Sequence, residues 1–197
     1  MSITFIRRLV LSNEIARAIL ELSVKLGALK YGDFTLSSGA KSNYYFDGRL
    51  ISLHPEGAYW LGKAFLEELK GQDIAAVGGP AMAAIPIVTA VALTSQVEGT
   101  PVKAFFVRTE TKAHGTGQQV EGGLESGKRV MIVDDACTSG SSLFAAIKAA
   151  EAAGCKVVKV MAVLDRQQGG GDELRSRGYA FSSLLKPAPD GTVQVVE

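Results

Sequence analysis

Two adjacent carboxylates and a run of small hydroxyl side chains follow an apolar segment in the second half of the chain. Residues 130–133 are all apolar, Asp134 and Asp135 come next, and 138–142 reads Thr-Ser-Gly-Ser-Ser before a helical pattern begins. Backbone N–H groups at a helix start, together with hydroxyl groups, are suited to binding a phosphate monoester. The carboxylates suit the diol of a ribose, bound directly or through a divalent metal. This segment therefore predicts a site for a sugar phosphate with free hydroxyl groups.

The acidic pair also has a purely structural interpretation. An aspartate at the end of a strand often caps a turn or the next helix, and a doublet alone fits that use well. The complete string D-D-x-x-T-x-G-x-[ST], with a strand before it and a helix after it, is far more restrictive. The complete string favours the phosphate site over the cap.

The segment 108–123 is a second candidate, because it is basic, rich in glycine and without apolar periodicity. It contains Arg108, Lys112 and His114, and glycines at 115, 117, 122 and 123 follow them. A basic loop that only contacts solvent would look similar. The position of this segment directly before the phosphate site favours a long mobile flap, which covers a polyanion during a reaction and then releases it.

The elements that position these residues alternate between strand and helix patterns. Helices are expected over 12–26, 55–69, 82–94 and 141–153, and core strands over 74–77, 102–107, 129–133 and 156–164. A hairpin is expected within 30–47, a loop at 78–80, and short strands over 179–185 and 192–196. This alternation predicts an α/β fold with a parallel sheet covered by helices on both faces.

Composition excludes several classes of protein. With 197 residues, 47% of them hydrophobic, the chain can form one domain with a substantial core. The net charge of +1 gives no reason to expect nucleic acid as a partner. The sequence shows neither an apolar run of membrane-spanning length nor the pattern of a signal peptide. Cys137 and Cys155 form neither a metal-ligand cluster nor a disulfide framework, which is typical of the reducing cytoplasm.

Four blocks of the sequence resemble, in the expected order, the motifs of one enzyme family. Lys30–Ser42 is similar to K-x-G-x-F-x-L-x-S-G-x-x-S, and Val107–Gly115 is similar to R-K-x-x-K-x-H-G. Asp134–Ser142 is similar to the signature for phosphoribosyl pyrophosphate (PRPP), and Leu164–Gln167 to an L-D-R motif after the last core strand. The PRPP signature is shared by many type I phosphoribosyltransferases. The first and fourth blocks and the flap resemble those of the orotate phosphoribosyltransferases.

The resemblance implies a fold, a domain organisation and an activity. The fold would be that of type I phosphoribosyltransferases, a mostly parallel sheet flanked by helices, with a small hood built from N-terminal segments, to which C-terminal segments could contribute. We expect a single domain over 1–197, with the hood at about 1–50, the core at about 51–185 and a flexible catalytic loop at about 108–123. The reaction would join orotate to PRPP and give orotidine 5′-monophosphate and pyrophosphate, on the route to UMP.

The resemblance also implies roles for the matched positions. Lys112, His114, Asp134 and Asp135 would be catalytic, with Lys112 acting electrostatically and the role of His114 left open. PRPP would be bound by Arg108, Lys112, His114, Asp134, Asp135, Ala136, Cys137, Thr138, Ser139, Gly140, Ser141 and Ser142. Orotate would be bound by Lys30, Tyr45, Phe46, Thr138 and Arg166. The cofactor Mg²⁺ would be held mainly through PRPP, with Asp134 and Asp135 nearby. The flap would reach into the site of a neighbouring subunit, which implies a homodimer.

Two positions depart from the family pattern, and two others have structural alternatives. Thr109 stands where the flap usually carries a lysine, and Ala83 stands near a position where some members place a lysine that touches pyrophosphate. Arg166 could instead form a surface ion pair beside Asp165. Tyr44 is expected in the core, on the opposite face of its strand from Tyr45.

Two other functions remain open from the sequence. A purine or other base phosphoribosyltransferase would share the PRPP loop but not the first and fourth blocks. A non-enzymatic regulator of the same fold would sense PRPP while binding nucleic acid, and would need a basic face that the balanced charge does not suggest. We expect neither nucleic acid nor membrane as a partner.

Overall fold

The computed structural model describes residues 3–35, 39, 41–108 and 119–196. The helices are α1 (Ile3–Lys25), α2 (Arg49–Ser52), α3 (Pro55–Leu69), α4 (Ala84–Val97), α5 (Ser141–Ala152) and α6 (Gly170–Ser176). The strands are β1 (Leu29–Thr35), β2 (Lys41–Phe46), β3 (Ala76–Pro80), β4 (Lys103–Val107), β5 (Val120–Gly122), β6 (Arg129–Cys137), β7 (Lys156–Asp165), β8 (Phe181–Pro187) and β9 (Val193–Val195). Within these described residues, no helix is long and apolar enough to cross a membrane.

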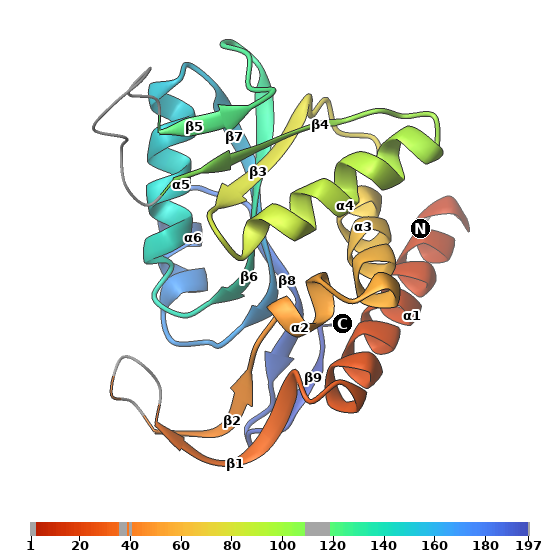
Figure 1. The fold of residues 1–197 in the computed structure, drawn as a ribbon, viewed down its shortest axis with the longest axis vertical. Helices are drawn as coiled ribbons and strands as arrows, with labels where there is room; N and C mark the ends of the chain where they lie inside the picture. The colour runs from red at the N-terminus through yellow and green to blue at the C-terminus, as the bar shows by residue number, and fades with distance from the viewer. Residues whose placement is uncertain (1–2, 36–38, 40, 109–118, 197) are drawn as a thin grey trace.

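A seven-stranded sheet forms the centre of the molecule, in the order β5-β4-β3-β6-β7-β8-β9 (Figure 1). The five inner strands are parallel, and β5 and β9 pair antiparallel at the two edges. Alternate residues of β6 enter two cores. Met131 and Val133 pack with α1, α3 and α4, while Val130 and Ile132 pack with α5 and α6. The expected fold class, a mostly parallel sheet flanked by helices, is confirmed.

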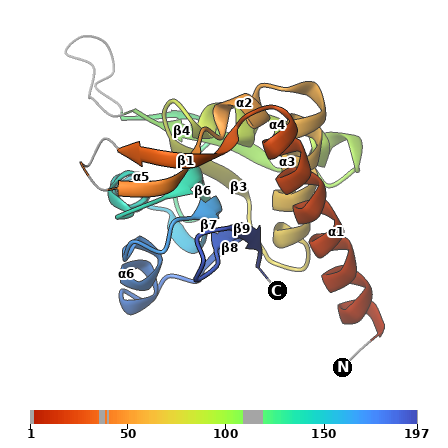
Figure 2. The same cartoon turned by 90° about the horizontal axis from the view of Figure 1, so that it is seen from below.

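A separate two-stranded sheet, β1 paired antiparallel with β2, lies beyond the carboxyl end of β6 (Figures 1 and 2). The C-terminal segment holds it from one side. The backbone N–H of Val193 donates to the Tyr31 hydroxyl at 3.0 Å, and the Asn43 amide donates to the Asp190 carbonyl at 3.3 Å. N-terminal and C-terminal segments therefore meet over this end of the sheet, where the resemblance places a hood.

The first core strand starts later than expected and includes the residues expected to form a loop. The expected strand was 74–77, whereas β3 runs over Ala76–Pro80. Gly78 and Gly79 are buried strand residues: a Cβ atom on Gly79 would lie 2.0 Å from the Val133 carbonyl oxygen. These glycines therefore permit close packing of neighbouring elements. The expectation of a loop was wrong because it took glycine only as a sign of a turn.

Other boundaries also differ from the expectations. Helix α1 begins at Ile3 rather than at residue 12, and α4 runs to Val97 rather than to 94. The segment 108–123, expected to lack regular structure, contains β5, which pairs with β4 from Val107↔Val120 to Phe105↔Gly122. The short helices α2 and α6 were not expected. Each is shorter than the span over which helical periodicity can be recognised.

Candidate active site

The acidic doublet lies at the carboxyl end of β6, as expected for a parallel sheet that presents ligands at this edge. Asp134 is 4% exposed, and its carboxylate accepts hydrogen bonds from the Ser142 hydroxyl at 2.9 Å and from the Asp135 backbone N–H at 2.9 Å. Asp135 is half-buried. The Asp134 carboxylate is therefore held by hydrogen bonds within the protein, whereas Asp135 is more exposed to solvent.

Burial changes the acidity of both carboxylates. Desolvation, followed by the nearby charge of Asp135, raises the pKa of Asp134 to about 7. Desolvation also raises the pKa of Asp135. The negative charge of Asp47 adds to this increase, and the positive charges of Arg49 and Arg166 oppose it. Negative charge held out of water attracts a cation or a group with developing positive charge. The doublet is thus suited to a metal-bound ribose.

The hydroxyl-rich segment forms a tight loop between β6 and α5. Gly140 has φ 78°, in the left-handed region, and immediately precedes α5. Ser139, Ser141 and Ser142 are exposed, whereas Thr138 and Ala136 are half-buried. The loop therefore presents hydroxyl groups and the N-terminus of a 12-residue helix to solvent, which is the arrangement that binds phosphate. Cys137 is fully buried, and burial raises the pKa of its thiol to about 12.

Gly170, which sequence reasoning did not single out, packs directly behind this loop. Its N–H donates to the Thr138 carbonyl at 2.9 Å. A Cβ atom on Gly170 would lie 2.6 Å from both the Gly140 nitrogen and the Thr138 oxygen. The only sequence signal was the glycine run 169–171 that follows the L-D-R block. No local pattern relates that run to residues 138–140.

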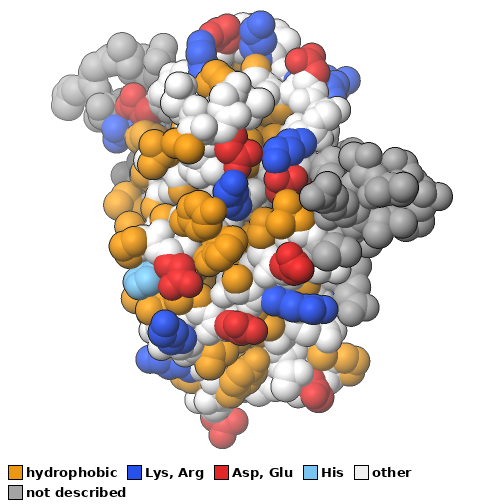
Figure 3. Space-filling model, turned by 90° about the vertical axis from the view of Figure 1, so that its right-hand side faces the viewer, with side chains coloured by type: hydrophobic (Ala, Val, Ile, Leu, Met, Phe, Trp, Pro, Cys, Tyr) orange, Lys and Arg blue, Asp and Glu red, His pale blue; other side chains and the backbone are white. Residues whose placement is uncertain are grey.

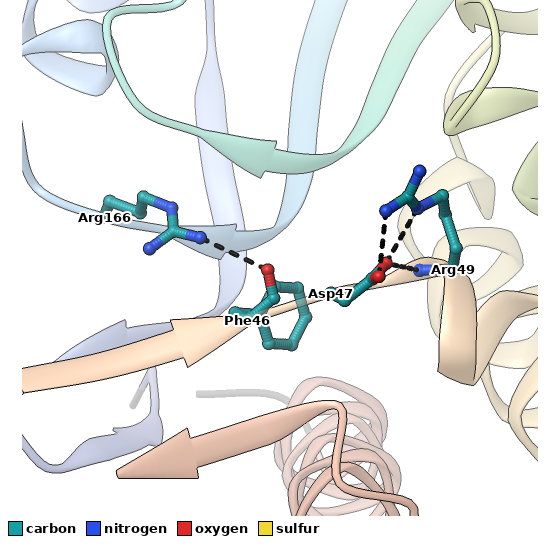
Figure 4. Close-up of polar contacts among 4 residues, drawn as sticks. All are labelled: Phe46, Asp47, Arg49 and Arg166. Atoms are coloured by element: carbon teal, nitrogen blue, oxygen red, sulfur yellow. Dashed lines mark hydrogen bonds and ion pairs between the residues drawn. The ribbon is translucent and has the colours of Figure 1, made fainter. Parts of the chain in front are cut away.

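Arg166 follows β7, the strand beside β6, and reaches the end of the β1–β2 sheet (Figure 4). Its Nη2 donates to the Phe46 carbonyl at 3.3 Å, and its Cζ lies 5.4 Å from the centre of the Tyr44 ring. Its Nη1 is buried with no protein partner. A buried guanidinium nitrogen without an acceptor favours binding of an anion. The described contacts of Arg166 include no ion pair with Asp165.

The predicted orotate-binding residues of β1 and β2 lie on two faces of this small sheet. Lys30 and Tyr45 are cross-strand partners and are both exposed. Phe46 and Tyr44 are buried, so Tyr44 and Tyr45 do face opposite sides as predicted. The Phe46 ring belongs to the core, and its carbonyl accepts a hydrogen bond from Arg166. Tyr44, expected only in the core, also contacts Arg166, and burial raises its pKa.

The described part of the predicted flap is its base. Arg108 follows β4, and its Nε donates to Glu121 of β5 at 3.0 Å. The order β4-β3-β6 separates it from the doublet by one strand. Lys112, His114 and Thr109 lie outside the described residues. Ala83 immediately precedes α4, in the connection that leaves the carboxyl end of β3.

An aspartate–arginine pair that the sequence analysis did not predict lies close to Asp135. In the turn after β2, Arg49 donates to Asp47 through Nε at 2.8 Å and Nη2 at 2.9 Å. This bond lowers the pKa of Asp47. Gly48, between them, is packed so closely that a Cβ atom would lie 2.5 Å from the Cβ of Asp135. The turn Asp47–Arg49 is therefore fixed against the acidic doublet.

Comparisons with known proteins agree with this site. Residues 56–183 match the family model of the phosphoribosyl transferase domain. Orotate phosphoribosyltransferase of Rhodopirellula baltica is 42% identical over 80% of this chain and 84% of its own, and that of Aquifex aeolicus is 42% identical over 83% and 91%. The Mycobacterium tuberculosis orotate phosphoribosyltransferase in complex with PRPP superposes with a TM-score of 0.70 at 30% identity, over 89% of this chain and 95% of that chain. This chain belongs to the phosphoribosyltransferase family, in its orotate phosphoribosyltransferase branch.

Proposed function

We propose that the chain transfers the 5-phosphoribosyl group of PRPP to N1 of orotate, giving orotidine 5′-monophosphate and pyrophosphate for pyrimidine synthesis. One observation carries the proposal. The acidic doublet, the hydroxyl-rich loop 138–142 (the phosphate loop) and the unpartnered Arg166 nitrogen meet at the carboxyl ends of two adjacent strands, β6 and β7. The identity with orotate phosphoribosyltransferases over most of the chain supports this choice of base.

The residues fit the parts of the two substrates. The loop 138–142 and the start of α5 would bind the 5′-phosphate, and Asp134 and Asp135 the ribose hydroxyl groups. Arg166 would pair with the carboxylate of orotate through its planar guanidinium, with Thr138, Lys30 and Tyr45 and the carbonyl of Phe46 close to the base. Lys112 and His114 are proposed to close over the pyrophosphate from the flap.

The chemical task of these residues is alignment and electrostatics. As C1 loses pyrophosphate, the ribose acquires oxocarbenium character, and the carboxylates stabilise the positive charge that develops. Arg166 would hold N1 of orotate in line with the breaking bond. Closure of the flap would exclude water, which would otherwise hydrolyse the activated sugar. No covalent bond to the protein is needed.

The donor set fits a magnesium ion that is held chiefly by substrate. Among the described residues, no group of three or more His, Cys, Asp or Glu side chains could hold a metal alone. The doublet supplies two carboxylates, and Mg²⁺ typically combines one or two carboxylates with substrate oxygens and water. Asp134 and Asp135 would hold the ion together with the ribose hydroxyl groups and pyrophosphate. When bound, the ion supplies positive charge to the leaving group.

A homodimer is proposed for the assembled enzyme, with each flap serving the neighbouring site. An apolar face on α3 and α4 supports this proposal: Tyr59, Leu93 and Val97 are 51%, 66% and 80% exposed and border a hollow of about 370 Å³. Figure 3 shows hydrophobic side chains gathered on this side of the molecule. Exposed apolar surface of this kind usually marks an interface between proteins.

A single domain and a cytoplasmic location are also proposed. Hydrophobic cores cover both faces of one continuous sheet, which supports a single domain. Cys137 and Cys155 are both free and buried, which suits a reducing compartment.

Incubation with PRPP, Mg²⁺ and one of four bases tests the proposed activity. We expect consumption of orotate and none of adenine, hypoxanthine or uracil. Consumption of a purine instead would assign the chain to another branch. A shift of labelled nucleic acid in a gel, together with no transferase activity, would support a regulator that senses PRPP.

A further inference from the structure

The guanidinium group of Arg49 lies at the carboxyl edge of the sheet, and none of the motifs above accounts for it. Its side chain is 60% exposed, although it is held by Asp47. The bidentate bond raises its pKa further above the usual value, so it is always a cation. Asp47 occupies only two of its N–H groups, which leaves others to bind a second anion. Arg49 is thus a fixed, accessible positive charge.

The position of Arg49 is set by the acidic doublet. The packing of Gly48 on Asp135 brings the turn against the end of β6. Asp135 and Arg49 are close enough for the positive charge of Arg49 to lower the pKa of that carboxyl. A ribose bound at the doublet would therefore lie within reach of this cation.

Arg49 also faces the connection that leaves the carboxyl end of β3. Together with Met82, Ile85 and Pro86, it borders a hollow of about 580 Å³. Ala83, the position without the lysine of some relatives, belongs to the same connection. Arg49 can therefore place positive charge where Ala83 cannot.

The strand order determines which part of PRPP would lie there. β6 has β7 on one side and β3 on the other. Figure 4 shows Arg166 beside Phe46, on the left, and Arg49 beside Asp47, on the right. An incoming base and a leaving group must lie on opposite sides of C1. If Arg166 holds the base, the leaving pyrophosphate lies on the side of β3 and Arg49.

We propose that Arg49 binds the pyrophosphate group of PRPP and supplies positive charge that Ala83 and Thr109 lack. The inference rests on the proposed function and adds a residue to it. Arginine is suited to this role because its planar fork pairs with two oxygens of a phosphate. Asp47 accepts only two of the guanidinium N–H groups of Arg49, and an asparagine at this position would keep one of the two acceptor oxygens.

The alternative is that Arg49 only fixes the turn through its ion pair with Asp47. The two roles separate in the reverse reaction, in which orotidine 5′-monophosphate and pyrophosphate are distinct substrates with separate KM values. An effect on the turn would alter both KM values, and Asp47→Asn would reproduce it. Binding of pyrophosphate would alter one KM value only, and Asp47→Asn would spare it.

The experiment compares wild type, Arg49→Ala, Arg49→Lys, Asp47→Asn and Arg129→Ala in the reverse direction. Arg129, an arginine at the opposite end of β6, is the matched control. We expect Arg49→Ala to raise the KM for pyrophosphate at least about tenfold, with the KM for the nucleotide within about twofold of wild type. Arg49→Lys should give an intermediate increase, because it keeps the charge and loses the fork. Asp47→Asn and Arg129→Ala should stay within about twofold for both KM values.

An unchanged KM for pyrophosphate in Arg49→Ala, or an equal rise in Asp47→Asn, would overturn the role of Arg49 and leave the proposed function intact. If Arg49→Ala does not fold, Arg49→Lys decides the question. A rise in the KM for pyrophosphate alone would support the role of Arg49, and an unchanged KM for pyrophosphate would overturn it. A wild-type enzyme that does not convert the nucleotide and pyrophosphate at all would overturn the proposed function itself.

Discussion

The hydroxyl of Ser142, in the first turn of α5, donates a 2.9 Å hydrogen bond to Oδ2 of Asp134, at the end of β6. This bond joins the phosphate loop to the acidic doublet. The two ends of the connection between β6 and α5 are therefore held at a fixed separation. In the proposed complex, the ribose hydroxyl groups would lie at Asp134 and the 5′-phosphate at the start of α5.

The buried Asp134 should make the ligand-free protein less stable as the pH rises. The pKa of Asp134 is raised from 3.8 to about 7 in the folded state, so its contribution to stability is full below pH 3.8 and is lost as the pH rises through about 7. Asp134→Asn lacks this dependence. We expect the free energy of unfolding of the variant, relative to wild type, to increase by on the order of 1 kcal/mol or more between about pH 5 and pH 8.

Urea unfolding in magnesium-free buffer measures this difference. Asp172→Asn, which changes a carboxylate whose side chain is 90% exposed, serves as the control. A constant difference between Asp134→Asn and wild type across this range would contradict the raised pKa.

Gly170→Ala should weaken PRPP binding selectively. The added methyl group would displace the backbone of Thr138 and Gly140, which forms the phosphate loop. We expect the KM for PRPP to rise about tenfold, the KM for orotate to stay within about twofold, and stability to fall by about 1–3 kcal/mol. Steady-state kinetics with each substrate varied in turn measures the split. Gly178→Ala is the control, because its positive φ of 87° also makes the substitution strained but its methyl group would have no atom within 4 Å. Equal KM values for PRPP in the two variants would refute the supporting role of Gly170.

Arg166→Lys should weaken the binding of orotate and leave PRPP binding unchanged. Lysine keeps the positive charge but cannot present two parallel N–H groups to a carboxylate, and it loses the contact with Tyr44. We expect the KM for orotate to rise at least about tenfold, with the KM for PRPP within about twofold. If both KM values stay at the wild-type level, Arg166 does not bind the base.

Leu93→Glu combined with Val97→Glu should dissociate the proposed dimer. Two charges at the exposed apolar face of α4 would have to be buried without partners. We expect sedimentation velocity to show a monomer with activity reduced at least about tenfold, since each site would lose the neighbouring flap. Val24→Glu, at an exposed apolar position on α1, should remain a dimer. A double variant that sediments like wild type would show that the α3–α4 face is not part of the dimer interface.

The sequence predicted the parts of the site that are contiguous along the chain. The apolar run before Asp134 and the hydroxyl run after it correspond to β6 and the start of α5, because strand burial and helix capping depend on neighbouring residues. The loop expected at 78–80 was wrong, since only the packing of Gly79 on Val133 explains why glycine stands in a strand.

The residues that the sequence did not reveal act through contacts between distant segments. Gly48 contacts Asp135, and Gly170 contacts Thr138. Tyr44 contacts Arg166 across more than half of the chain. Periodicity and motif spacing report only local structure, so such contacts appear only when the fold is known. The sequence Asp-Gly-Arg at 47–49 was a visible signal, because glycine between two opposite charges indicates a tight, polar turn.

The role of the acidic doublet can be tested most directly by its removal. Asp134→Asn combined with Asp135→Asn keeps the size of both side chains and removes both charges. Orotate consumption is measured with PRPP and Mg²⁺, and circular dichroism verifies that the variant is folded. We expect the rate to fall at least about 100-fold relative to wild type. A folded double variant that forms orotidine 5′-monophosphate at the wild-type rate would show that the ribose is bound elsewhere.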